Sequence, residues 1–184
     1  MEIKLGLKIY KDDKAQMAKY NNVANYCNSN NLTIEDKGEF YEVVEIPLPT
    51  LEELKAAKLA EVDAWTAAKI TGGFVSSATG EAVTYDSDKD TQLTVASDLN
   101  TINLAPEIFN EKFPDGYPMR GYPAGTNTSD KNNKVIYHLT KEQLLQWNVD
   151  IGLHRGACKQ AGWDKQAEVE AAQSKEELDA ILLD

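Results

Sequence analysis

This 184-residue chain has few cysteines, no long apolar run and no cluster of basic residues, all of which are features that often indicate a function. It has only two cysteines, Cys27 and Cys158, which lie far apart in the sequence. A disulfide framework in a chain of this size needs more, so we expect two reduced, partly buried thiols. There is no run of 18 apolar residues and no basic apolar leader. The sequence therefore favours neither a membrane span nor a secretion signal.

Clusters of basic residues are missing as well. The formal net charge is −11, and the lysines are scattered along the chain. Contacts to phosphate groups need lysine and arginine side chains grouped together, so we expect no general binding to nucleic acid. The acidity instead indicates solubility or a basic surface on a partner protein.

The two histidines, His138 and His154, lack metal-ligand spacing with each other and with either cysteine. His154 lies on a predicted apolar helix stripe, which favours a hydrogen-bonded core histidine. The alternative is a Cys158 nucleophile with His154 as its base, since positions four apart share a helix face. No oxyanion site or orienting acid accompanies that pair, and the sequence predicts no enzyme and no cofactor.

Three acids, Asp86, Asp88 and Asp90, copy the first ligand positions of a calcium loop. The rest of the motif fails, because Thr91 stands where the sharp turn needs glycine and Ser97 where a bidentate glutamate belongs. Helix capping is the favoured interpretation of all three acids, and no metal site is predicted.

The stretch from Lys58 to Thr94 organises the rest of the chain. A helix over residues 51 to 70 is predicted to stop at the double glycine 72–73, because glycine readily takes the left-handed conformation that closes a last turn. A short hairpin turns at Thr79-Gly80, and Ser87 is expected to cap a second helix.

The amino-terminal part predicts a β-α-β-β domain over residues 1–47, with strands at 3–10, 32–35 and 40–46 and a helix at 14–28. The segment Pro47-Leu48-Pro49 is the expected linker, since proline cannot continue a central strand. A capping box, Thr50 to Glu53, then opens a helical domain over residues 50–184.

Two further capping boxes begin at Thr140 and Ser174. The first opens a helix that is expected to run to about Gly162 with one buried apolar face. Gly152 and Gly156 on that helix would allow the close approach of a neighbour. The fold class that follows is α+β, with a small β-α-β-β unit and a mainly helical domain that carries a short hairpin and a long irregular loop.

That loop is predicted over residues 110–133, where prolines and glycines are frequent. It contains residue types that are favoured in protein contacts, and the candidates are Phe113, Tyr117, Met119, Arg120 and Tyr122. In the competing interpretation the same aromatic side chains hold the loop onto its own domain.

A group of short motifs also carries a family resemblance. The residues are Asp63-Ala64-Trp65, Lys69-Ile70, Gly73-Phe74, Tyr85-Asp86-Ser87-Asp88, Thr91-Gln92, and a later block from Leu139 to Leu144 with His154-Arg155. They resemble a domain of unknown biochemical role that recurs in tailed-phage tail-fibre and tail-fibre-assembly proteins. The resemblance covers roughly residues 50 to 165.

The resemblance implies a phage tail protein, either an assembly chaperone for the receptor-binding fibre or a minor virion component. Its partner would be a tail-fibre protein or another tail protein, and self-association is an alternative that the sequence leaves open. Neither nucleic acid nor a membrane is expected as a partner. The protein would act in the host bacterial cytoplasm during assembly or in the virion tail. The alternative is a small phage or prophage protein that binds and inhibits a host defence factor.

Overall fold

The computed structural model describes residues 2–184. These residues form two compact units, one ending at Thr50 and one running from Leu51 to Asp184. Each unit combines helices with one antiparallel sheet, which confirms the predicted α+β class. Within the described residues, no helix has the length and apolar character that crossing a membrane requires.

The first unit contains β1 (Lys8–Tyr10), α1 (Lys14–Met17), α2 (Tyr20–Ser29), β2 (Leu32–Asp36) and β3 (Phe40–Glu45). The three predicted strands are present, but two helices stand where a single helix over residues 14–28 was predicted. Its sheet has the order β1-β3-β2. The first strand is shorter than the predicted 3–10, because Gly6 takes a φ of 78° and turns the chain before it. The buried core of the first unit is formed by Ile9, Val23, Cys27 and Val43.

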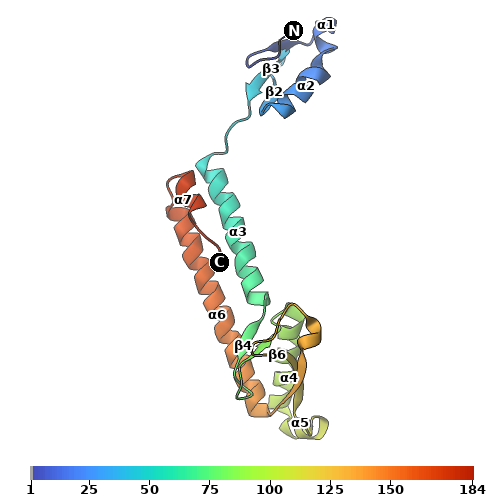
Figure 1. The fold of residues 1–184 in the computed structure, drawn as a ribbon, viewed down its shortest axis with the longest axis vertical. Helices are drawn as coiled ribbons and strands as arrows, with labels where there is room; N and C mark the ends of the chain where they lie inside the picture. Colours follow the sequence, from blue (N-terminus) through green and yellow to red (C-terminus); the bar gives the residue numbers. More distant parts are fainter. Residues whose placement is uncertain (1) are drawn as a thin grey trace. The chain divides into compact units, whose positions relative to one another are not determined.

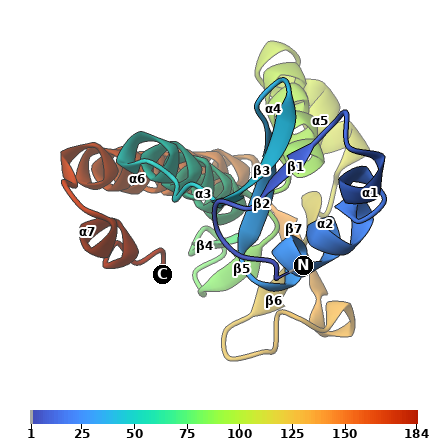
Figure 2. The same ribbon diagram turned by 90° about the horizontal axis from the view of Figure 1, so that it is seen from above.

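The second unit contains the remaining elements: α3 (Leu51–Thr71), β4 (Phe74–Ser76), β5 (Val83–Tyr85), α4 (Lys89–Leu104), α5 (Pro106–Lys112), β6 (Tyr117–Pro123), η1 (Lys131–Asn133), β7 (Val135–Leu139), α6 (Lys141–Ala171) and α7 (Lys175–Asp179). Its sheet has the order β4-β5-β6-β7. Figures 1 and 2 both show α3 running alongside α6.

The prediction of an irregular loop over residues 110–133 is wrong. Residues 117–123 form β6, which pairs with β5 on one side and with β7 on the other. Prolines and glycines are rare in central strands, and their presence hid this one. The glycine at 121 has a packing reason, since a Cβ there would lie 2.5 Å from Cγ1 of Val83 and 3.0 Å from the ring of Tyr85.

The helix α6 runs to Ala171, well beyond the predicted end at Gly162. Gly162 is the position where α6 approaches α3 closely, because a Cβ there would lie 2.4 Å from Oγ1 of Thr66. The same role was predicted for Gly152 and Gly156, and within this chain that prediction is wrong. Both are exposed, and no described atom lies within 4 Å of a Cβ built on either.

The predicted caps at Thr140 and Ser174 are confirmed, but Ser87 does not cap α4. Asp88 does so, accepting a hydrogen bond from the Thr91 amide at 2.9 Å. Ser87 is instead buried behind the end of α3, where its hydroxyl donates to the Ile70 carbonyl at 2.7 Å. The same oxygen accepts from the Gly73 amide at 2.9 Å, so one side chain ties the end of α3 to the chain that enters α4.

Candidate protein-contact site

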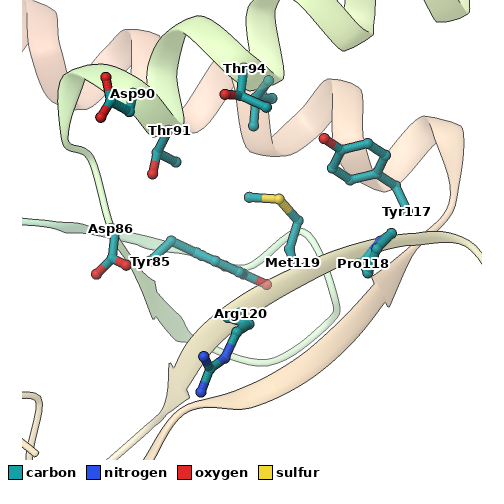
Figure 3. Close-up of a pocket in the computed structure, with 10 residues that line it drawn as sticks. Tyr85, Asp86, Asp90, Thr91, Thr94, Tyr117, Pro118, Met119 and Arg120 are labelled. Carbon is teal, nitrogen blue, oxygen red and sulfur yellow. The ribbon is translucent and has the colours of Figure 1, made fainter. Parts of the chain in front are cut away.

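A pocket opens between α4 and the strands β5 and β6, and we call it the α4–β6 pocket. It has a volume of about 350 Å³. Figure 3 shows its lining, which comes from the first turns of α4 and from both strands. The lining residues are Tyr85, Asp86, Asp90, Thr91, Thr94, Val95, Tyr117, Pro118, Met119 and Arg120.

The floor of the pocket is apolar and held in place by packing. The Met119 side chain points from β6 toward α4 and is almost fully buried (Figure 3). Beside it, the Tyr117 hydroxyl donates to a carboxylate oxygen of Asp98 on α4. Burial, with the hydrogen bond and charge of Asp98 in second place, raises the pKa of Tyr117 well above its usual range. The tyrosine is therefore neutral and links β6 to α4.

Two acids of the apparent calcium motif, Asp86 and Asp90, line the pocket, and Asp88 lies between them in the sequence. Asp88 caps α4, and hydrogen bonds from the side chain and amide of Thr91 lower its pKa. Asp90 lies exposed in the first helical turn, where the positive end of the helix dipole stabilises a carboxylate. Capping is thus a sound interpretation for Asp88 and a first-turn role fits Asp90.

Capping is wrong for Asp86. Its carboxylate forms an ion pair with Lys134, whose Nζ also lies 5.1 Å from the centre of the Tyr122 ring. This pair joins β5 to the segment that enters β7 and restricts the Asp86 side chain. Within the described residues, no three His, Cys, Asp or Glu side chains are grouped as a metal site would need.

The structure separates the five predicted contact residues. Tyr117, Met119 and Tyr122 are buried, and Phe113 is half-buried with its ring 5.1 Å from that of Tyr117. These four contribute to their own unit, as the competing interpretation held. Arg120 is exposed at the mouth of the pocket, and its guanidinium points away from α4 (Figure 3). Contact with a partner stays a prediction, and of the five, Arg120 is the side chain best placed for it.

The histidine and cysteine on α6 lie close together, four residues apart on one helix. His154 Nε2 lies 3.0 Å from the Lys69 carbonyl oxygen, so this nitrogen carries the proton and donates it. The predicted hydrogen bond is present, but His154 is half-buried and does not belong to the core as predicted. Cys158 Sγ lies 3.7 Å from the same nitrogen and 3.9 Å from Nδ1, the ring nitrogen whose lone pair is then free to accept the thiol proton.

Thr94, which lines the pocket, and Lys134, which pairs with Asp86 beside it, were not predicted from the sequence. Thr94 follows Asp90 by four residues on one helix, and that spacing could have placed it on the same face. Lys134 had no such signal, because it is 48 residues from Asp86 and reaches it only through the sheet.

The short motifs of the sequence lie within a segment that matches a known family model. A family model described as a domain of unknown function, DUF4376, matches residues 53–182, which is well over half of the chain. This chain belongs to the DUF4376 family. The match covers nearly all of the second unit of this DUF4376 protein, including the α4–β6 pocket. No curated protein and no solved structure matches the chain. The resemblance to phage tail proteins stays a prediction.

Proposed function

We propose that this DUF4376 protein is a phage tail protein that acts by binding another polypeptide, as a tail-fibre assembly chaperone or as a minor component of the virion. The support comes from the sequence resemblance over residues 50–165 and from the α4–β6 pocket. An apolar floor with a polar and charged rim is the arrangement that protein contact sites use.

The chemistry of the pocket favours a basic side chain of the partner. The Met119 floor can cover the methylene stem of a lysine or arginine, and the exposed Asp90 carboxylate can meet its charge. The chain's net charge of −11 would attract a basic surface over a longer range. Arg120, whose guanidinium points away from α4, can bind a carboxylate of the partner outside the pocket.

The proposal is tested by capture of tail proteins. Tagged chain would be purified from bacteria infected with the phage that encodes it, and the bound proteins identified by mass spectrometry. The tail-fibre protein or another tail protein should bind, and binding should weaken in Asp90→Lys. A host defence protein as the stoichiometric partner would contradict the tail assignment and support the inhibitor alternative.

A further inference from the structure

The outer face of α6 carries a row of large apolar side chains that nothing within the second unit covers. Leu145, Val149, Leu153 and Trp163 are all exposed, Leu153 to 69% and Trp163 to 58%. At 100° per residue they fall on one side of the helix, opposite the buried Trp147, Ile151 and Cys158. We call this row, with the two glycines between its members, the α6 outer face.

The glycines Gly152 and Gly156 lie on the same face. Glycine is a weaker helix former than alanine, so each of them lowers the stability of the helix. No described atom would contact a Cβ at either position, so packing within the chain does not account for them. Close approach of a second helix would account for both, because glycine brings two backbones together.

The charged residues beside the α6 outer face indicate which molecule binds it. One flank carries Lys141, Arg155 and Lys159, and the other carries Glu142 and Asp164. When two identical helices pair in parallel, the basic flank of one lies along the acidic flank of the other. In an antiparallel pair each flank would meet its own copy, and like charges would face each other.

We propose that the α6 outer face binds the same face of a second copy of this chain, with the two α6 helices parallel. The face extends from Leu145 to Trp163, which is about 27 Å of helix or five turns. The proposal goes beyond the proposed function and does not depend on the α4–β6 pocket or on a tail partner.

The first test is the mass of the full chain in solution, measured by light scattering or sedimentation over a concentration series. Wild type should form a dimer, and Leu153→Glu should weaken dimerisation at least tenfold by placing a charge in the contact. Leu93→Glu is the matched control, since Leu93 lies on α4 and is 70% exposed. The proposal would be overturned if wild type stayed monomeric up to about 100 µM. It would also be overturned if Leu153→Glu and Leu93→Glu weakened dimerisation equally.

A second variant separates the interface from the fold. Gly156→Ala should raise the melting temperature of dilute monomer, since it improves an exposed helix, while it weakens dimerisation by several fold. A gain in stability with unchanged dimerisation would overturn the assignment of this face.

The orientation is tested with Leu145→Cys, because in a parallel pair position 145 faces its own copy. Mild oxidation should then link the two chains through that disulfide, and wild type, whose two cysteines are buried, should give no such product. Linkage only when this variant is mixed with Trp163→Cys would overturn the parallel arrangement.

Discussion

Tyr85 and Tyr117 place two hydroxyls inside the second unit, and they differ in their partners. Tyr117 donates to Asp98, whereas the Tyr85 hydroxyl has no hydrogen-bond partner of ordinary geometry among residues 2–184. A buried polar group without a partner costs free energy, while a satisfied one contributes to stability. The same substitution at the two positions should therefore have different effects.

We expect Tyr117→Phe to lower the free energy of unfolding by about 1–2 kcal/mol, because Asp98 loses its donor. Tyr85→Phe should leave it unchanged or raise it by up to about 1 kcal/mol, because an unpartnered hydroxyl is removed and the ring remains. Denaturant unfolding of both variants checks this. A larger loss in Tyr85→Phe than in Tyr117→Phe would contradict the assignment of partners.

The same tyrosines predict an alkaline limit to stability. Burial raises the pKa of Tyr85 to about 12, with a smaller contribution from Tyr137 and a weak opposing one from Thr79. A tyrosine with a raised pKa stabilises the fold fully below its unfolded pKa of about 10, and this contribution is lost as the pH rises through the folded pKa.

The free energy of unfolding should accordingly fall between about pH 10 and pH 12. Tyr85→Phe should make that fall shallower, because one of the shifted groups is removed. Absorbance titration near 295 nm, combined with unfolding curves at each pH, measures both effects. Titration of all eight tyrosines near pH 10 in the folded protein would contradict the burial of Tyr85 and Tyr117.

At the scale of elements, Ser87 holds the end of α3 to the start of α4 through two hydrogen bonds. Ser87→Ala should lower the free energy of unfolding by about 1–3 kcal/mol, since it leaves the partly buried Ile70 carbonyl and Gly73 amide without their partner. Ser77→Ala, at an exposed serine in the β4–β5 turn, is the control and should stay within about 0.5 kcal/mol of wild type. Equal effects of the two changes would argue against this connection.

The packing of α3 on α6 depends on a different residue. Gly162→Ala should destabilise the second unit by about 1–3 kcal/mol, because the new methyl group meets Oγ1 of Thr66. Gly152→Ala, at an open position of the same helix, should stabilise dilute protein by up to about 1 kcal/mol. Thermal unfolding of both variants under one set of conditions compares them, and a stable Gly162→Ala variant would show that α3 and α6 pack less closely.

Elements that are fixed by neighbouring residues could be predicted from the sequence. The Gly72–Gly73 stop, the Thr79-Gly80 turn and the Thr140 capping box each act within a few residues, and the structure contains all three features. The strand β6 could not be predicted, because its stability comes from two partner strands distant in sequence. The α4–β6 pocket could not be predicted for the same reason, although the sequence marks two of its acids and Tyr117 individually.

At the scale of the whole molecule, the segment between the two units should be the first site of proteolysis. Leu48 is 87% exposed, and residues 46–50 form no helix or strand. Limited digestion should cut near residue 48 and leave a folded fragment that contains the DUF4376 match. Mass spectrometry identifies the cut, and circular dichroism checks the fragment. Unfolding of the whole chain after this cut would show that the units depend on each other.

The central claim is that the α4–β6 pocket binds a tail protein, and one titration tests it most directly. The purified tail-fibre protein of the same phage would be titrated with wild type, Asp90→Lys and Glu176→Lys. The last variant is the matched control, because Asp90 and Glu176 are both acids in the first turn of a helix. We expect Asp90→Lys to weaken binding at least tenfold and Glu176→Lys to change it less than twofold. Equal affinity of wild type and Asp90→Lys, or no binding of wild type, would contradict the claim.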